Sequence, residues 1–156
     1  MWTRFAPAFA AIGLLSAAVV ITGGCTERAT LLPNADPDLN KPSTQLAREA
    51  VQKFPYPVTL AKSPDPLPVR AELGYVLNEI SLLNYGDADL ADIDLWVNGQ
   101  YVVGLTKLES KKIKKVPFEV LYNPAGQHFP RDGAFINKLE MRVGEVMYDV
   151  TTQLGQ

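Results

Sequence analysis

The chain of 156 residues has few of the side chains on which most catalytic and metal sites depend. It contains one cysteine, Cys25, and one histidine, His128. A single cysteine forms no internal disulfide and no CxxC motif, and a single histidine excludes the two-histidine HExxH zinc helix. The GxSxG, GxxxxGK[ST] and GxGxxG patterns are also missing. With a net charge of −2, the composition gives no general case for binding nucleic acid, and no motif calls for a cofactor.

What the chain does have is a short hydrophobic run before its cysteine. Residues 1–4 carry a positive charge, residues 5–21 are apolar, and the small residues 22–24 precede Cys25. This arrangement resembles the lipobox signal peptide of bacterial lipoproteins. The resemblance implies that residues 1–24 are removed and that Cys25 receives acyl chains, typically palmitate. It also implies a lipid-anchored protein of the bacterial cell envelope. Because Thr26 rather than aspartate follows the cysteine, the expected location is the outer membrane, facing the periplasm.

Two alternatives for this segment stay open, because Thr22 stands where lipoproteins prefer leucine. One is an ordinary secretory signal cut at another position, and the other is an uncleaved membrane anchor. The apolar run of 17 residues is shorter than the span of about 20 that a membrane helix needs, and it contains Pro7 and Gly13. Its length therefore argues against the anchor.

The rest of the chain divides into four segments. Residues 25–42 are rich in proline, asparagine and aspartate, which predicts a flexible tether. Apolar residues at helical spacing in 43–54, after a capping serine or threonine, predict a short amphipathic helix that docks on the following domain, on a partner or on the membrane. Five of the fourteen residues in 55–68 are proline, which predicts a linker or strap. Residues 69–156 are expected to form a β domain.

Two hairpins dominate the β domain. Alternating apolar residues in 93–97 lead into Asn98-Gly99, a strong hairpin signal because both turn positions need a positive φ. Pairing Val97 with Gln100 then predicts that Trp96 lies opposite Tyr101. The second predicted hairpin turns at Gly144-Glu145, with strands in 139–143 and 146–150 that pair Val143 with Val146 and place Glu140 beside Asp149 on the outside.

Further strands are expected at 73–83 and 116–122, with a short apolar start at 134–136. About six short strands with turns between them predict a mainly β protein, a small antiparallel β-sandwich. The layout over residues 73–154 is similar to immunoglobulin-like and fibronectin type III domains.

Trp96 and Tyr101 are the candidate binding residues. If they form a cross-strand pair on an exposed face, they offer a stacking surface to sugar rings or an anchor for a protein partner. The alternative is that this face is buried under the predicted helix or strap. Trp96 would then serve only to hold the fold together.

Charged residues offer weaker candidates. Asp87, Asp89, Asp92 and Asp94 form the densest acidic stretch and are weak candidates for calcium, although a solvated turn is the simpler interpretation. Five lysines between positions 107 and 115 suggest a protected edge strand, or a patch for anionic lipid or polysaccharide. His128 with Asp132 would be needed for a hydrolytic site, the remotest alternative.

The sequence therefore predicts a membrane-anchored envelope lipoprotein whose β domain is structural or binds an envelope protein, without catalysis. The alternative is a module that binds polysaccharide or peptidoglycan. The remote alternative is an enzyme that uses His128.

The lipid anchor can be tested directly. Cys25→Ser removes the acylated thiol, so we expect the variant to lose labelling by radioactive palmitate and to accumulate as a larger precursor in cells. Labelling and gel mobility equal to those of the unmutated protein would show that Cys25 is not lipidated.

Overall fold

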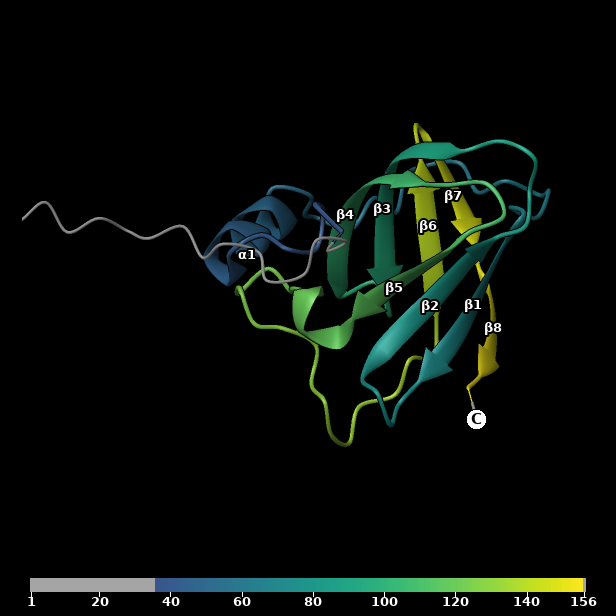
Figure 1. Cartoon of the computed structure of the whole chain (residues 1–156). Helices are drawn as coiled ribbons and strands as arrows, with labels where there is room; N and C mark the ends of the chain where they lie inside the picture. Colours follow the sequence, from purple (N-terminus) through teal and green to yellow (C-terminus); the bar gives the residue numbers. More distant parts are fainter. Residues whose placement is uncertain (1–35, 156) are drawn as a thin grey trace, which may run out of the picture. The chain divides into compact units, whose positions relative to one another are not determined.

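A computed structural model describes residues 36–155 of the chain (Figure 1). The predicted signal peptide, its cleavage site and Cys25 lie outside these residues, so they stay predictions. Within the described range, no helix is long and apolar enough to cross a membrane.

Two four-stranded sheets form the described part, together with one short helix. The strand orders are β5-β2-β1-β8 and β4-β3-β6-β7. Neighbouring strands are antiparallel except β1 and β8, which run parallel. The elements are α1 (Ser43–Val51), β1 (Val69–Gly74), β2 (Glu79–Asn84), β3 (Leu90–Val97), β4 (Tyr101–Leu108), β5 (Ile113–Pro117), η1 (Phe118–Val120), β6 (Leu139–Val143), β7 (Val146–Asp149) and β8 (Thr151–Leu154).

The strand order is that of an immunoglobulin-like sandwich. If β1 to β7 are lettered A, B, C, C′, E, F and G, then A, B and E share one sheet, and C, F and G share the other. The strand β8 follows G and joins the edge of the first sheet beside A. The predicted β-sandwich class is confirmed, with eight strands in place of about six.

Burial along the strands shows where the two sheets meet. In β1 and β2, buried and more exposed residues alternate, as expected for strands with one face in the core. In β3 the last five residues, 93–97, are all buried, so both faces of this strand are covered. The helix α1 packs against the neighbouring strand β4, and it buries Leu46 and Ala50 there. The helix thus docks on the chain's own β domain, as the sequence suggested.

The predicted strand at 73–83 is wrong, because the chain turns back within it. β1 ends at Gly74, β2 begins at Glu79, and these two residues pair across the ladder. Asn78, with φ of 54°, supplies the left-handed position in the turn. Val76 and Leu77 continue the apolar pattern of the strands but lie in the turn, exposed to solvent. The apolar pattern of the sequence therefore predicted one long strand where the structure has the two strands β1 and β2.

The first predicted hairpin is present, but its register is shifted by one residue. Asn98 and Gly99 both have positive φ, 54° and 66°, and the Gln100 N–H donates to the Val97 carbonyl over 3.0 Å. The ladder nevertheless pairs Val97 with Tyr101, because Gln100 also belongs to the loop. The predicted pairing of Trp96 with Tyr101 is wrong.

The second predicted hairpin has the expected register. Val143 pairs with Val146 and Glu140 with Asp149, and Gly144 adopts a φ of 59°. The prediction for Glu140 was wrong in one respect, because this residue is buried rather than on the outside.

Three element boundaries also differ from the prediction. The helix ends at Val51 rather than at residue 54, and no side chain caps its start. The strand expected at 116–122 stops at Pro117 and continues as the turn of 3-10 helix η1. The apolar residues 134–136 form no strand.

The segment before α1 is held on the domain rather than free. Asp38 is buried, and it accepts hydrogen bonds from the Thr106 N–H and hydroxyl over 2.9 and 2.7 Å. Lys114 pairs with both Asp36 and Asp38 over 2.9 and 2.7 Å. Residues 36–42 of the predicted tether 25–42 are therefore held on the domain, and residues 25–35 lie outside the described part of the chain.

The proline-rich segment 55–68 behaves as a strap. The Ser63 N–H donates to the Met147 carbonyl over 3.0 Å, and the Met147 N–H donates to the Ala61 carbonyl over 3.1 Å. These bonds occupy part of the free edge of β7, an edge that would otherwise be open to pairing with another chain.

Matched leucine variants in the β1–β2 hairpin test this packing. Leu82 is fully buried between the sheets, so we expect Leu82→Ala to lower the free energy of unfolding by about 2–5 kcal/mol. Leu77 lies in the exposed turn, so the same change there should cost less than about 1 kcal/mol. Urea unfolding followed by tryptophan fluorescence measures both, and equal losses would contradict the arrangement of this hairpin.

Candidate functional site

Trp96, the first candidate binding residue, is buried. Its side chain is only 1 % exposed. Phe54 and Tyr56, from the segment after α1, stand edge-on against its ring, each with a centroid separation of 5.1 Å. The alternative interpretation therefore holds, and Trp96 organises the packing of the strap on β3 instead of presenting a flat surface to a ligand.

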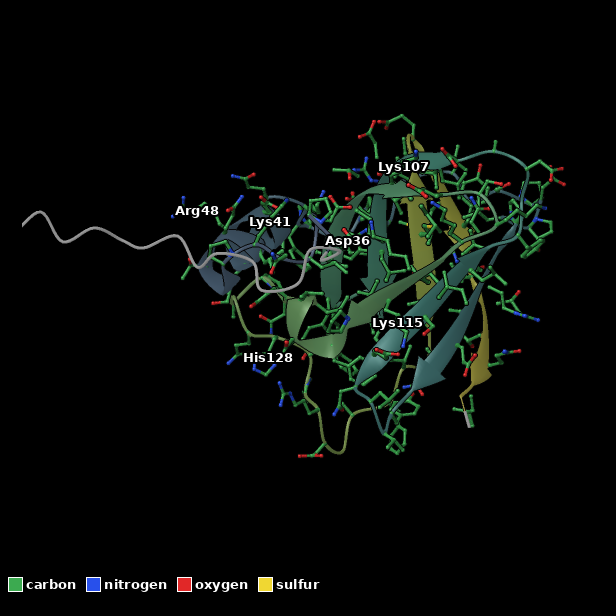
Figure 2. The ribbon with its side chains drawn as sticks, in the orientation of Figure 1. Asp36, Lys41, Arg48, Lys107, Lys115 and His128 are labelled. Carbon is green, nitrogen blue, oxygen red and sulfur yellow. The ribbon has the colours of Figure 1, made fainter. Side chains whose placement is uncertain are left out.

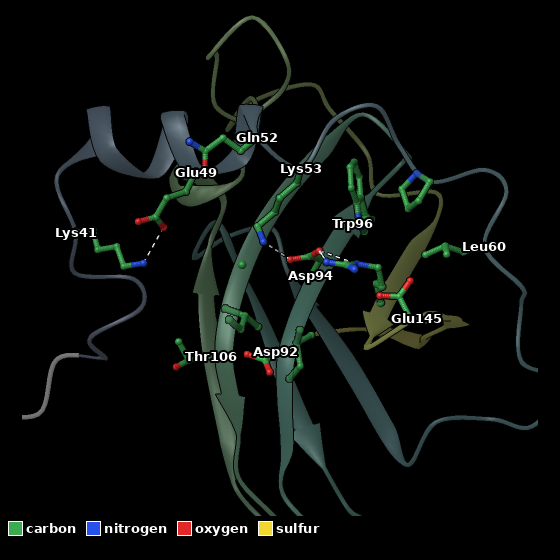
Figure 3. Close-up of a pocket in the computed structure, with 15 residues that line it drawn as sticks. Lys41, Glu49, Gln52, Lys53, Leu60, Asp92, Asp94, Trp96, Thr106 and Glu145 are labelled. Carbon is green, nitrogen blue, oxygen red and sulfur yellow. Dashed lines mark hydrogen bonds and ion pairs between the residues drawn. The ribbon is translucent and has the colours of Figure 1, made fainter.

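A buried carboxylate next to Trp96 ties the helix end to the sheet. Asp94 on β3 pairs with Lys53, which follows α1, and with Arg142 on β6, whose Nε donates over 2.8 Å (Figure 3). Gly104 lies opposite Asp94 on β4, and a Cβ there would come within 2.8 Å of the Lys53 side chain. The missing side chain at Gly104 lets Lys53 cross β4 and reach Asp94.

A second buried carboxylate, Glu140, lies beneath the strap. It accepts a hydrogen bond of 2.6 Å from the Tyr56 hydroxyl and pairs with Lys62 and Lys138 over 2.8 and 2.9 Å. Burial by itself raises the pKa of Glu140, but these three donors outweigh it and hold the pKa below its usual value. Burial and the bond to Glu140 raise the pKa of Tyr56 to about 12. Lys62 also bonds Asp149 over 2.8 Å, which relieves the repulsion expected between the paired carboxylates.

A cavity of about 680 Å³ lies between α1, the strap and the outer face of β3 and β4 (Figure 3). Most charged groups in its wall already pair with one another, Lys41 with Glu49 over 2.7 Å and Asp94 with its two cations. Asp94 is buried, so a ligand that displaced one of its two cations would leave a buried charge without a partner, which is strongly unfavourable. The cavity is therefore better suited to holding the helix than to binding a charged molecule.

A second hollow, which we call the aromatic groove, has about 530 Å³ and is mainly apolar. Tyr101, the second candidate residue, is half-buried here, and its ring lies edge-on to Phe129 at 5.1 Å. Three segments far apart in the sequence meet in the groove, and its lining residues are Phe54, Pro55, Tyr56, Gly99, Gln100, Tyr101, Asn123 and Pro124.

Sequence reasoning identified Tyr101 but missed the other rings of the groove. The usable signal was the run Phe54-Pro55-Tyr56, in which two aromatic side chains flank a proline. The sequence could not show that this run folds back beside the β3–β4 turn.

The four aspartates considered for calcium do not converge. Asp87 pairs with Lys111 over 2.9 Å, and Asp89 pairs with Lys107 over 2.8 Å. Asp92 is exposed with a φ of 51°, whereas Asp94 is buried in its ion pairs. Among residues 36–155, no group of three or more histidine, cysteine, aspartate or glutamate side chains could hold a metal ion.

The lysines between 107 and 115 are paired rather than gathered into a free patch. Each of them has a carboxylate partner; the five are Lys107, Lys111, Lys112, Lys114 and Lys115. β5 is an edge strand, as predicted. Figure 2 shows Lys115 beside β5 and Lys107 near the end of β4. The arrangement therefore fits protection of a sheet edge.

His128 is exposed on the loop after η1 (Figure 2). Its Nδ1 lies 3.0 Å from the Phe129 carbonyl oxygen. It lines neither of the two cavities, and the described bonds include none between His128 and Asp132. The structure thus does not bring together the residues that a hydrolytic site would need.

Comparison with protein-family models, with curated proteins and with solved structures found no match to this chain.

The buried carboxylate Glu140 predicts a specific acid sensitivity. Its folded-state pKa lies below the usual 4.5, so its contribution to stability is present above that value and is lost as the pH falls through the lowered pKa. We expect the free energy of unfolding to fall as the pH drops below 4.5, and to fall less steeply in Glu140→Gln. Urea unfolding at each pH measures the slope.

The control for this experiment is Asp132→Asn, which changes an exposed carboxylate outside the described ion pairs. It should keep the slope of the unmutated protein. A Glu140→Gln slope as steep as that of the control would contradict the assigned role of Glu140.

Proposed function

We propose that the protein is a lipid-anchored lipoprotein of the bacterial cell envelope whose β-sandwich is a non-catalytic protein-interaction domain. The lipobox-like residues 22–25 support the anchor, and Thr26 after the cysteine supports the outer-membrane location facing the periplasm. The described domain supports the interaction role, since its histidine lies away from both cavities and most of its charged side chains are far apart or paired with one another. The aromatic groove is the surface that we expect a partner to bind.

The aromatic groove carries the proposal. Aromatic side chains are enriched among the residues that dominate protein interfaces, because they bury a large area with few rotatable bonds. Phe54 and Tyr56 are held by Trp96, and Tyr101 by Phe129, so the rings are already positioned before a partner binds. A preorganised groove loses less conformational entropy on binding.

The shape and chemistry of the groove favour an extended peptide segment. Grooves lined by aromatic and proline side chains bind polyproline-like segments, which are extended before binding. Gln100 is exposed at the groove, and its side chain makes none of the described hydrogen bonds, so it is available for a peptide carbonyl or N–H. We propose that the partner presents an extended, proline-containing segment of another envelope protein.

A second candidate function is binding of polysaccharide or peptidoglycan. It is favoured by one observation, the presence of Tyr101 together with the exposed amide side chain of Gln100 in the same groove. Rings and amides together suit sugar faces and hydroxyl groups. The burial of Trp96 removes the larger platform that this function would have used.

Crosslinking in intact cells tests the interaction role. A photoreactive benzoylphenylalanine in place of Gln100 should trap a defined envelope protein. Adding Tyr101→Ala should reduce the yield about tenfold, since loss of a central aromatic side chain typically costs more than 1 kcal/mol of binding. The matched control is Tyr85→Ala, which removes an exposed tyrosine outside the groove and should leave the yield unchanged.

Other outcomes would decide against the peptide partner. A product with lipid alone, or an equal yield with both tyrosine variants, would contradict it. Co-sedimentation of the purified protein with peptidoglycan, lost in Tyr101→Ala and kept in Tyr85→Ala, would favour the second candidate instead.

A further inference from the structure

Four large apolar side chains are exposed at one end of the sandwich. Val76 and Leu77, in the β1–β2 turn, are 92 % and 69 % exposed, Phe135 in the loop before β6 is 68 % exposed, and Leu154 at the end of β8 is 73 % exposed. Figure 1 shows the β1–β2 turn, this loop and the end of β8 at the same end of the two sheets. We call these four residues the apolar tip.

Contacts between the segments fix the positions of the apolar tip. The Tyr75 ring lies 5.9 Å from the Phe135 ring, and its hydroxyl accepts a hydrogen bond of 2.9 Å from the Ile136 N–H. The Gly155 N–H donates to the Leu73 carbonyl over 2.9 Å, which holds the end of β8 beside the end of β1. The exposed side chains therefore project from a structured end of the domain.

The chemistry around the apolar tip favours lipid. Soluble surfaces normally carry such side chains singly, and several together mark a surface for a partner or a membrane. Side chains that project from turns need a matching pocket on a protein, whereas a bilayer accepts them without one. Of the nearby charges, Lys115 pairs with Glu79 and Arg131 with Glu119. The exposed carboxylates Glu72 and Asp132 make none of the described ion pairs, so they have to stay in water outside the acyl chains.

The length of chain before the domain allows the tip to reach the bilayer. Ten residues separate Cys25 from Asp36, which is up to roughly 33 Å when fully extended. Asp36 is held by Lys114, which lies opposite Leu82 in the ladder. Leu77 is five residues from Leu82, roughly 16 Å along the strand direction. The extended segment between Cys25 and Asp36 is longer than the path from Asp36 to Leu77, even when the length of the Lys114 side chain is added to that path.

We infer that the apolar tip inserts into the lipid bilayer next to the anchor, with Val76, Leu77 and Phe135 among the upper acyl chains and Tyr75 at the level of the headgroups. The inference rests on the proposed lipid anchor at Cys25. The acyl chains expected on Cys25 attach the protein to the membrane, and the tip adds a second contact that limits how the domain can turn on its tether. Tyrosine at the headgroup level follows its usual preference for the membrane interface.

Insertion of the tip would also orient the aromatic groove. The Asn98 side-chain amide donates to the Phe135 carbonyl over 2.8 Å, and Asn98 precedes the groove residues Gly99 and Gln100. The groove is thereby held close to the membrane surface. The peptide it binds would then come from a segment near the bilayer.

Depth-dependent quenching tests the inference on the full-length lipidated protein, purified and placed in vesicles of phosphatidylethanolamine and phosphatidylglycerol. Leu77→Cys carries a nitrobenzoxadiazole label, and the matched control is Asp87→Cys, in the loop at the other end of β2, where the side chain is 97 % exposed. We expect brominated lipid to quench the label at position 77 several-fold more strongly than at position 87, with a blue-shifted emission at position 77 only.

Flotation of the vesicles, with and without Cys25→Ser, reports on the anchor separately. Equal, weak quenching at both positions in protein that floats would overturn insertion of the tip and leave the anchor intact. Failure to float, or a Cys25 thiol that takes up the label, would overturn the anchor and the inference that rests on it. Protection of position 77 in cell membranes but not in protein-free vesicles would place a protein on the tip and overturn the assignment to lipid.

Discussion

The structure depends on how the outer face of β3 is covered. Trp96 and Asp94 both lie on this strand and both are buried. The segment that follows α1 covers them and shields them from water. Phe54 and Tyr56 close over the indole ring, while Lys53 and Arg142 neutralise the buried carboxylate. A buried charge keeps its place only when its partners are present, so the ion pairs fix where the helix end must lie.

This covering has a consequence for function. The residues that the sequence suggested for ligand binding do not form a site. Trp96 and Asp94 are buried in the domain, and the exposed Asp87 and Asp89 pair with lysines. The surface that is left consists of the aromatic groove beside the β3–β4 turn and the apolar tip beyond it. Asn98 links the two through its bond to Phe135. The proposed function follows from these two surfaces: recognition of a partner in the groove, with the proposed anchor setting the location of the protein and the proposed insertion of the tip setting its orientation.

Local signals in the sequence predicted much of the fold. Asn98-Gly99 and Gly144-Glu145 marked both hairpins because their backbone conformations need those residues. The same signals could not set the β3–β4 register, since Gln100 can belong to either the strand or the loop, and one residue decides which side chains face each other. The apolar pattern likewise could not separate β1 from β2. Val76 and Leu77 look like strand residues, and only the pairing of Gly74 with Glu79 shows that they are not.

By itself, the sequence determined the class of the fold, a mainly antiparallel β-sandwich preceded by a proline-rich segment, and it predicted a lipoprotein-type leader that ends before a lone cysteine. These features are local in the chain, so composition and spacing reveal them. Only the tertiary structure decided that Trp96 is buried, that Tyr101 belongs to a groove with Phe54 and Tyr56, and that Val76, Leu77, Phe135 and Leu154 share one end of the domain. Each of these facts joins residues separated by dozens of positions, and such contacts are set by packing between elements rather than by the pattern within any one of them.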